Sequence, residues 1–330
     1  MRRKGIGVII FTLLFGLLFG GCNKKSDLTP VTLNEVAHSI FYAPQYVALE
    51  KGYFEEEGLK VELVNGLGAD KTMTALLAGD CDIGFMGSEA SIYVYVQGSE
   101  DYAVNFAQLT QRAGNFLVSK DVNENFKWDN VKGKTVLGGR VGGMPEMVFE
   151  YVLKKQGIDP KKDLTIIQNI DFGLTAEAFA SGKGDYTIEF EPAAEALERE
   201  GKGKVVASIG VESGMVPYTA YSAKKSYITE HPEVVQGFTN AIQKGLNFVN
   251  SHTPEEIAEV IAPQFPETEK QALINIVTRY YEQDTWKANA VFEEESFILL
   301  QKILEEAGEL TEKVPYEDLI NTDYAKKAAE

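Results

Sequence analysis

The sequence predicts an α/β protein of two lobes, in which each lobe is a mostly parallel sheet flanked by helices and two hinge strands connect the lobes. Strand-like and helix-like segments alternate over residues 31–114. The same alternation begins again at about residue 115 and continues to residue 218. Strand–helix–strand order favours parallel strands with right-handed crossovers, so two such modules predict two sheets.

The first module is expected to begin with a short strand at residues 32–37. Pro44 opens a helix whose apolar residues share faces at four- and seven-residue spacing as far as Phe54, and Gly58 ends it. Residues 59–63 alternate apolar and charged side chains, which is typical of a half-buried strand. A helix at 71–78, a strand at 81–87 and a helix at 89–97 complete the module.

The second module repeats this order. Strands are expected at 134–139, 164–169, 186–191 and 204–210, and helices at 144–156, 175–181 and 192–200. Beyond residue 225 the chain reads as almost entirely helical, with apolar stripes at 235–249 and 297–304.

Two extended runs, residues 104–119 and 215–225, lie outside both modules. We expect the chain to cross to lobe two near residue 115 and to return near residue 218. Lobe one then comprises residues 31–114 and 219–330, and lobe two residues 115–218. Two crossing strands form a hinge, and a ligand cleft is expected between the lobes.

Residues 1–21 predict a secretory signal peptide. A basic head precedes an almost continuously apolar run over residues 6–19, which is short for a membrane-spanning helix of about 20 residues. Cys22 follows two glycines, as in the lipobox of bacterial lipoproteins, although Phe19 stands where that motif usually has an aliphatic residue. We expect a lipidated Cys22 and a tether over 22–30, which anchor the protein to the cell membrane. The alternative is an ordinary signal peptide that is cut elsewhere.

Composition excludes several classes of function. Without the basic residues of the leader, 29 basic residues stand against 49 acidic ones, a formal net charge of −20. This disfavours nucleic acid and anionic membrane surfaces as partners. If Cys22 is lipidated, Cys81 has no partner for a disulfide within the chain. HExxH, GxSxG and CxxC motifs do not occur, and we expect a monomer with no metal, no cofactor and no catalytic activity.

Five segments carry a family resemblance: HSIFYAPQYVALEKGYFEEEGLKVEL from residue 38, ALLAGDCDIGFMGSEASIYVY from 75, EFEP from 189, PYTAYSAKK from 217 and VPYEDLINTDYA from 314. They resemble the periplasmic-binding-protein type II fold, and within it the nitrate-, sulfonate-, taurine- and thiamine-pyrimidine-binding proteins. The resemblance covers nearly the whole mature chain. It implies an extracytoplasmic solute-binding lipoprotein of an ABC importer, with a permease and its ATPase as partners and with ligand capture by lobe closure.

Ligands of open α/β sheets bind beyond the carboxyl ends of the strands, in loops that begin helices. Four such loops are expected here, at 38–44, 87–89, 138–146 and 189–192, together with one residue of the first hinge run and one of the C-terminal part. The candidate ligand-binding residues are His38, Ser39, Phe41, Tyr42, Gly87, Ser88, Glu89, Arg112, Gly142, Gly143, Met144, Glu189, Phe190, Glu191 and Trp286.

These residues leave the ligand class open between two alternatives. Glycines before a helix suit an anion, which fits nitrate, a sulfonate or taurine. Carboxylates at 189 and 191 favour an amine or a ring N–H instead, and Arg112 and Arg140 are the only obvious cations on this side. We prefer a neutral or amine-bearing aromatic heterocycle, such as a thiamine-pyrimidine precursor, held between aromatic side chains.

Two other classes of function compete with import. His38 lies where the sequence resembles a loop of the thiamine-pyrimidine synthase, an enzyme of the same fold that consumes one of its own histidines. That enzyme's cysteine-rich motif is absent here. A lipid-anchored sensor or adhesin that uses the same lobes is the second alternative.

Overall fold

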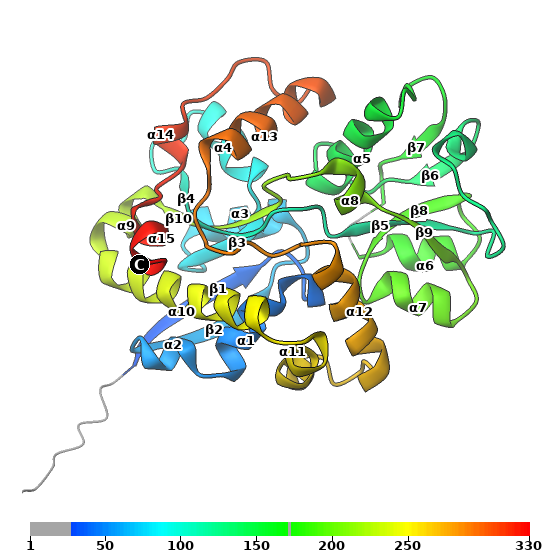
Figure 1. Ribbon diagram of the computed structural model, residues 1–330. Coiled ribbons are helices and arrows are strands. Elements are labelled where there is room, and N and C mark those ends of the chain that lie inside the picture. Colours follow the sequence, from blue (N-terminus) through cyan, green and yellow to red (C-terminus); the bar gives the residue numbers. More distant parts are fainter. Residues whose placement is uncertain (1–27, 171–172) are drawn as a thin grey trace, which may run out of the picture.

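The computed structural model describes residues 28–170 and 173–330 (Figure 1). The expected signal peptide and Cys22 lie outside these residues. None of the helices in the described ranges is both long and apolar enough to cross a membrane. Cys81 is buried and forms no disulfide there.

The first sheet has five strands in the order β2-β1-β3-β10-β4. Its strands are β1 (Thr29–Glu35), β2 (Leu59–Asn65), β3 (Ile83–Gly87), β4 (Ala103–Thr110) and β10 (Thr219–Lys224). β1 pairs in parallel with β2 and with β3, whereas β10 is antiparallel to both β3 and β4. β3 and β4 are buried along their whole length.

The second sheet repeats this arrangement in the order β7-β6-β8-β5-β9. Its strands are β5 (Asn115–Ser119), β6 (Thr135–Leu137), β7 (Thr165–Ile167), β8 (Tyr186–Phe190) and β9 (Lys204–Ser208). β6 is parallel to β7 and β8, and β5 is antiparallel to β8 and β9. We call the part of the molecule built on the first sheet lobe one and the part built on the second sheet lobe two.

The two-lobed α/β fold is confirmed, but both sheets are mixed. The parallel order expected from the alternating pattern holds for the first three strands of each sheet. The antiparallel strand in each sheet is the first one that the chain forms after it crosses from the other lobe, β5 in lobe two and β10 in lobe one. In each sheet this strand lies between one of the three parallel strands and an edge strand, β5 between β8 and β9 and β10 between β3 and β4.

Helices cover both sheets. Lobe one holds η1 (Ile40–Tyr42), α1 (Ala43–Glu50), α2 (Tyr53–Glu56), α3 (Ala69–Ala78) and α4 (Glu89–Val96). The single helix expected from Pro44 past Phe54 is therefore two helices. The chain turns at Gly52, whose φ of 72° is in the left-handed region that glycine tolerates and that an α-helix excludes.

Lobe two holds η2 (Trp128–Val131), α5 (Met144–Lys155), α6 (Thr175–Ala180), α7 (Ala193–Arg199) and α8 (Ile209–Ser213). The C-terminal part is helical, as its apolar stripes predict. It forms α9 (Lys225–Glu230), α10 (Pro232–Ser251), α11 (Pro254–Ile261), η3 (Ala262–Gln264), α12 (Lys270–Glu282), α13 (Glu294–Ala307), α14 (Tyr316–Leu319) and α15 (Asp323–Ala328).

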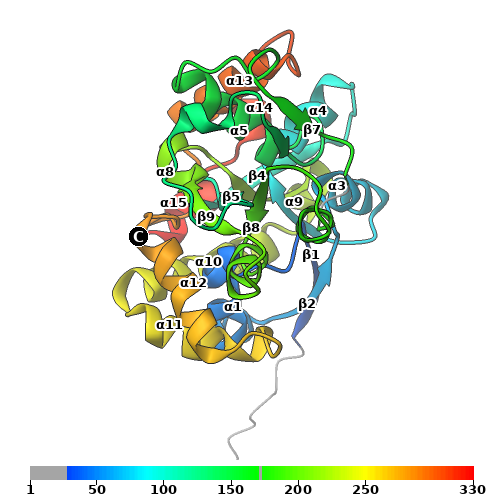
Figure 2. The same cartoon turned by 90° about the vertical axis from the view of Figure 1, so that its right-hand side faces the viewer.

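The C-terminal helices do more than cover lobe one. The predicted stripe on α10 is buried, and α10 packs against α1, α2 and α15. α13 packs against α5 of lobe two, and α12 lies beside the other end of the contact between the lobes (Figures 1 and 2). Both lobes are therefore in contact with helices that come from the end of the chain.

Candidate functional site

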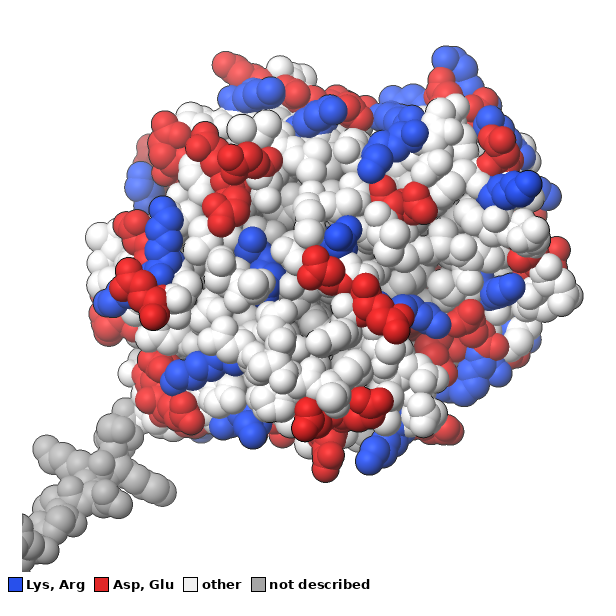
Figure 3. Space-filling model, viewed as in Figure 1, with Lys and Arg blue, Asp and Glu red and all other residues white. Residues whose placement is uncertain are grey.

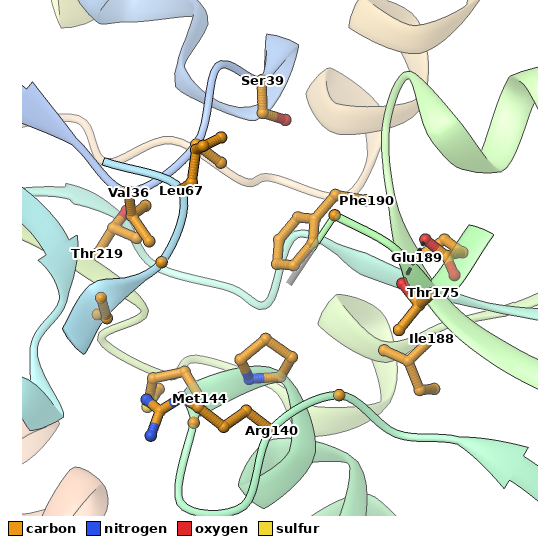
Figure 4. A pocket seen from close by; sticks show the side chains of 18 of the residues that line it. Val36, Ser39, Leu67, Arg140, Met144, Thr175, Ile188, Glu189, Phe190 and Thr219 are labelled. Atoms are coloured by element: carbon orange, nitrogen blue, oxygen red, sulfur yellow. Dashed lines mark hydrogen bonds between the residues drawn. The ribbon is translucent and has the colours of Figure 1, made fainter. Parts of the chain in front are cut away.

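A cavity of about 310 Å³ lies between the two sheets. Lobe one lines it with the ends of β2 and β3, with the loops that follow β1, β2 and β3, and with residues just before and at the start of β10. Lobe two lines it with the loop before α5, the start of α6 and the end of β8. In Figure 4, Val36 and Thr219 lie on one side of the cavity, Glu189 and Thr175 on the other, and Phe190 between them.

Ten of the predicted residues line this cavity. They are His38, Ser39, Tyr42, Gly87, Glu89, Gly143, Met144, Glu189, Phe190 and Glu191. They come from all four expected loops, and each loop follows a strand of one of the two sheets. The rule that ligands bind beyond the carboxyl ends of strands therefore leads to this cavity in both lobes.

The other five candidates lie nearby but do not line the cavity. Phe41 is fully buried behind it, packed on the rings of Tyr42, Phe190, Tyr218 and Tyr280. The Trp286 indole donates a 2.8 Å hydrogen bond to the carbonyl oxygen of Phe41 and so fixes the segment that carries Phe41. Both aromatic residues support the cavity wall rather than form it.

Ser88, Gly142 and Arg112 are also occupied by contacts within the protein. The Ser88 hydroxyl donates to the carbonyl oxygen of Pro217 at 2.7 Å. Gly142 is buried, and its carbonyl oxygen accepts a 2.9 Å hydrogen bond from the Tyr93 hydroxyl. Arg112 is half-buried near the carbonyl oxygen of Gly210 and 3.9 Å from Asp284, away from the cavity lining.

Sequence reasoning missed several apolar and small residues of the lining. Val36, Leu67 and Thr219 lie near strand ends of lobe one, and Thr175 and Ile188 belong to lobe two. The position of Leu67 could have been predicted, because it lies in the loop that follows β2. Its apolar side chain, however, gave no indication of a ligand contact. The other four have residue types that a strand or helix core also uses, so no sequence pattern distinguishes them.

The glycine loop before α5 does not offer free N–H groups to an anion. The N–H of Gly142 donates to the carboxylate of Glu146 at 3.3 Å, and the N–H of Gly143 donates to the carbonyl oxygen of Arg140 at 3.1 Å. A second donor, the Gln168 amide, contacts the same Glu146 carboxylate at 2.6 Å. The N–H groups of Gly142 and Gly143, which were expected to hold an anion at this helix terminus, thus already have acceptors within the protein.

Three buried carboxyl groups line the cavity. Burial raises the pKa of Glu89 to about 7, and an ion pair is not among its contacts in the described residues. Burial also raises the pKa of Glu189 to about 7, against the opposing effect of hydroxyl donors from Thr187 and Thr175. Glu191 pairs with Arg279 of α12 and accepts from the N–H of Glu195 at 2.8 Å, yet burial still raises its pKa.

The cations at the cavity are exposed by comparison. Lys71 and Arg140 line its edge, and both are exposed to solvent. Arg140 lies 3.9 Å from Asp70, and the negative charge of Asp70 weakens the attraction of Arg140 for a bound anion. On the outer surface, acidic and basic side chains are mixed over both lobes on the face shown in Figure 3. The cavity thus has buried carboxyl groups in its lining and exposed cations at its edge.

His38 is held in a hydrogen-bonded network. Its Nδ1 lies 2.8 Å from the Glu35 carboxylate and its Nε2 lies 2.8 Å from the carbonyl oxygen of Gln264. The fully buried Glu35 also accepts from the Gln45 amide and the Tyr46 hydroxyl. The Glu35 hydrogen bond raises the pKa of His38, because both ring nitrogens face acceptors and a doubly protonated ring satisfies both.

The lobes touch across the cavity. The Ser39 hydroxyl of lobe one donates to the carbonyl oxygen of Glu191 in lobe two at 2.7 Å. At the opposite side, Tyr93 of lobe one donates to Gly142 of lobe two. Arg279 of α12 pairs with both Glu191 and Glu198. These contacts hold the lobes together beside the cavity, so a molecule bound there touches residues of both lobes.

A family model described as NMT1/THI5 like matches residues 40–257. The chain belongs to the NMT1/THI5-like family. The matched range begins in the first ligand loop and includes all of β10, so it contains most of the cavity lining.

The relatives of this chain include proteins named as binding proteins and proteins named as enzymes. The chain is 47% identical over 315 residues to YtlA of Bacillus subtilis (strain 168), a protein whose name gives it a binding role by inference, with 96% of this chain and 94% of YtlA covered. It is 25% identical over 223 residues to the 4-amino-5-hydroxymethyl-2-methylpyrimidine phosphate synthase of Aspergillus parasiticus, with 63% of each chain covered.

Solved structures share the fold at low identity. The periplasmic nitrate-binding protein NrtA from Synechocystis PCC 6803 superposes with a TM-score of 0.75 at 15% identity, over 92% of this chain and 89% of NrtA. The ligand-binding component of an ABC-type import system from Staphylococcus aureus superposes with a TM-score of 0.74 at 14% identity, over 91% and 99% of the two chains. This NMT1/THI5-like chain therefore has the periplasmic-binding-protein fold.

Proposed function

We propose that this protein is the solute-binding component of an ABC importer, and that it catalyses no reaction. The observation that carries the proposal is a cavity lined by both lobes, which touch each other on more than one side of it. Burying a small molecule between two lobes joined by two crossings is a mechanism of capture, because bound ligand favours the closed arrangement by its differential affinity for it. The binding role named for YtlA and the import role named for the Staphylococcus aureus protein support the same function.

For this function we take lobe one as residues 31–114 and 219–330 and lobe two as residues 115–218. A permease that recognises the closed arrangement of these lobes is the proposed partner, with its ATPase on the far side of the membrane. We further propose that Cys22 is lipidated and holds the protein at the outer face of the cell membrane. Cys22→Ser is then expected to release the protein from membranes without changing its ligand affinity.

We infer that the ligand is a nitrogen heterocycle that carries an amino group. Three buried carboxyl groups line the cavity. Glu189 and Glu191 have donors within the protein, whereas one oxygen of Glu89 has none in the described residues, and a buried carboxyl oxygen is costly unless a donor satisfies it. Tyr42 and Phe190 offer aromatic rings on opposite lobes. Aromatic contacts contribute about 0.5–1.5 kcal/mol each beyond the area that they bury. The pyrimidine named in the synthase relative has both features, a ring and an amino group.

Nitrate, a sulfonate or taurine is the alternative ligand class, and the exposed Lys71 and Arg140 at the cavity edge are what favours it. Two observations weigh against it. The N–H groups of Gly142 and Gly143 already have acceptors, and no arginine of the described chain reaches the cavity interior in a bidentate geometry. A buried acidic lining also repels a bare anion.

The synthase activity of the related enzyme is disfavoured by the state of His38. A histidine that is consumed as a nitrogen donor needs a free ring nitrogen. Both ring nitrogens of His38 are held, by Glu35 and by Gln264, at 2.8 Å each. We therefore assign His38 a structural part in holding the first ligand loop.

A thermal-shift screen of purified protein, stripped of bound ligand, tests the proposed function. The panel contains thiamine, its aminopyrimidine precursors, riboflavin, polyamines, nitrate, taurine and alkanesulfonates. A ligand present at 100 times its Kd adds about 2.7 kcal/mol of stability. A shift with an aminopyrimidine supports the proposal in full. A shift only with nitrate or sulfonates supports binding but contradicts the ligand class, and chemical turnover of a ligand contradicts the assignment as a binding protein.

A further inference from the structure

Glu89 is the first residue of α4 and is almost fully buried, with 1% of its surface exposed. It lines the cavity, and within the described residues its Oε2 atom has no hydrogen-bond partner. A buried acceptor without a partner costs roughly 1–3 kcal/mol, so proteins retain one only where something else compensates. The N–H groups of Glu89 itself and of Met144 act on the carboxyl group, whereas the Ser88 hydroxyl is directed away to the carbonyl oxygen of Pro217. These contacts leave Oε2 without a partner in the described residues.

Gly87 provides the space that this carboxyl group occupies. A Cβ atom at Gly87 would lie 2.1 Å from Oε2 and 2.7 Å from Oε1 of Glu89. The backbone of Gly87 is not in the left-handed region, so the glycine is not required for its conformation. The local sequence therefore combines a residue without a side chain and an acidic residue two positions later, and together they place a carboxyl group against the cavity wall.

No positive charge of the protein neutralises this group. Arg140 is the cation whose field reaches it, but the Arg140 side chain is exposed and lies beside Asp70. The other ionisable groups around Glu89 are the hydroxyls of Tyr42, Tyr93 and Tyr218, which are neutral. Tyr42 also lines the cavity, with its ring against those of Phe41 and Phe85.

We propose that Glu89 is a ligand-binding residue, and that its carboxyl group pairs with the amino group and the adjacent ring nitrogen of a bound amino-substituted nitrogen heterocycle. This inference rests on the proposed function and adds the residue that selects the ligand class. A carboxyl group and an amino-substituted ring with a neighbouring nitrogen form two parallel hydrogen bonds. The amino N–H donates to one carboxyl oxygen, and a second proton, held either by the other carboxyl oxygen or by the ring nitrogen, forms the other bond. The pair satisfies the buried oxygen and brings no net charge into the cavity.

Selectivity follows from the same pairing. A heterocycle of equal size without the amino group leaves the Glu89 oxygen unpaired in the closed cavity. We expect such an analogue to bind more weakly by roughly tenfold to a hundredfold, the range that an unsatisfied buried acceptor implies. A site that rejects the analogue in this way identifies its ligand by the N–H donor rather than by ring shape.

The test is titration calorimetry with two probes, 4-amino-5-hydroxymethyl-2-methylpyrimidine and the same pyrimidine without its amino group. The proteins are the wild type, Glu89→Leu, Glu89→Gln and Gly87→Ala. Glu100→Gln is the matched control, because it removes an exposed carboxylate just beyond α4. Glutamine keeps an acceptor beside a donor, whereas leucine keeps neither, and alanine at 87 displaces the carboxyl group while Glu89 itself is unchanged.

We expect the affinity for the aminopyrimidine to fall in the order wild type, Glu89→Gln, Glu89→Leu, with a loss of more than tenfold for Glu89→Leu and Gly87→Ala and none for Glu100→Gln. Glu89→Leu should bind the two pyrimidines about equally. An unchanged Kd in Glu89→Leu, or an unchanged ratio between the two probes, overturns the role of Glu89 and leaves the proposed function intact. Binding of nitrate but of neither pyrimidine by the wild type overturns the ligand class as well.

Discussion

The Ser39 hydroxyl donates a 2.7 Å hydrogen bond to the carbonyl oxygen of Glu191, so a loop of lobe one is joined directly to a loop of lobe two at the edge of the cavity. The two residues are 152 positions apart in the chain. The contact exists only when the lobes are together. It belongs to the closed arrangement in which the cavity is surrounded by both lobes, and its loss should shift the balance between open and closed forms.

Ser39→Ala tests this contact. A neutral hydrogen bond contributes about 1 kcal/mol net, so the ratio of open to closed ligand-free protein should rise roughly fivefold. Small-angle X-ray scattering should show a larger radius of gyration for the variant. Ser181→Ala is the control, because its hydroxyl donates only to Ala178 within lobe two. An identical scattering curve for Ser39→Ala and wild type would show that the contact does not bias closure.

Arg279→Met tests the ion pairs that join α12 to lobe two. The change leaves the buried Glu191 without its cation and should cost roughly 2 kcal/mol of unfolding free energy, less than a fully buried pair because part of Arg279 is exposed. Without Arg279 the pKa of Glu191 rises further, so the loss should be larger at about pH 8 than at about pH 5. Urea denaturation at both pH values measures this loss of unfolding free energy.

The matched control for that change is Arg199→Met. Arg199 pairs with Glu195 on one turn of α7 and is largely exposed, so its loss should cost less than about 0.5 kcal/mol at either pH. Equal effects of the two substitutions would contradict a stabilising role for the ion pairs between Arg279 and lobe two.

Glu89→Gln should stabilise the ligand-free protein at high pH. Burial raises the pKa of Glu89 from its usual 4.5 to about 7. A carboxyl group whose pKa is raised in the folded state favours folding below the unfolded value, and this contribution is lost as the pH rises through 7. The shift corresponds to about 3 kcal/mol, which the wild type should lose between about pH 4.5 and pH 8 and which Glu89→Gln should keep.

Chemical denaturation across this range checks the prediction without ligand. Higher stability combined with weaker binding is the combination expected of a residue that serves the ligand at the expense of the fold. A destabilised Glu89→Gln at about pH 8 would indicate instead that the carboxylate is structural.

His38→Asn should show the dependence on pH of a stabilising histidine. The Glu35 hydrogen bond raises the pKa of His38 above 6.5 in the folded protein. The stabilisation is fully present below about pH 6.5 and is lost as the pH rises through the folded-state pKa. The difference in unfolding free energy between wild type and variant should therefore shrink from about pH 5.5 to about pH 8.5. A difference that grows over this range would mean that His38 is neutral in the fold.

The sequence allowed the elements of the fold to be predicted where periodicity is strong. The stripe on α10 and the alternation in β2 have one clear structural reading each, and the structure confirms both. The break at Gly52 was not predicted, because apolar spacing continues across it as if the helix did. The antiparallel placement of β10 was not predicted either, since its partner strand β3 lies more than 130 positions earlier in the chain and no local pattern encodes such a pairing.

The location of the candidate site could be predicted better than its composition. The carboxyl ends of β1, β3, β6 and β8 led to loops that line the cavity between the lobes. Within a loop, however, neighbouring side chains point in different directions. Phe41 packs into the core and Tyr42 lines the cavity, although the two are adjacent aromatic residues. In the sequence, Val36 and Thr219 cannot be distinguished from ordinary strand residues. Only the position of the second lobe opposite them shows that they line the cavity.

Titration calorimetry with Phe190→Ala tests the central claim most directly, that the cavity between the lobes binds an amino-substituted aromatic heterocycle. Phe190 stands between the two sides of the cavity in Figure 4. We expect the wild type to bind 4-amino-5-hydroxymethyl-2-methylpyrimidine with a Kd on the order of micromolar, about −8 kcal/mol, and not to bind nitrate. Phe190→Ala should weaken pyrimidine binding by more than tenfold. Nitrate binding by the wild type, with pyrimidine affinity absent or unchanged in Phe190→Ala, would contradict it.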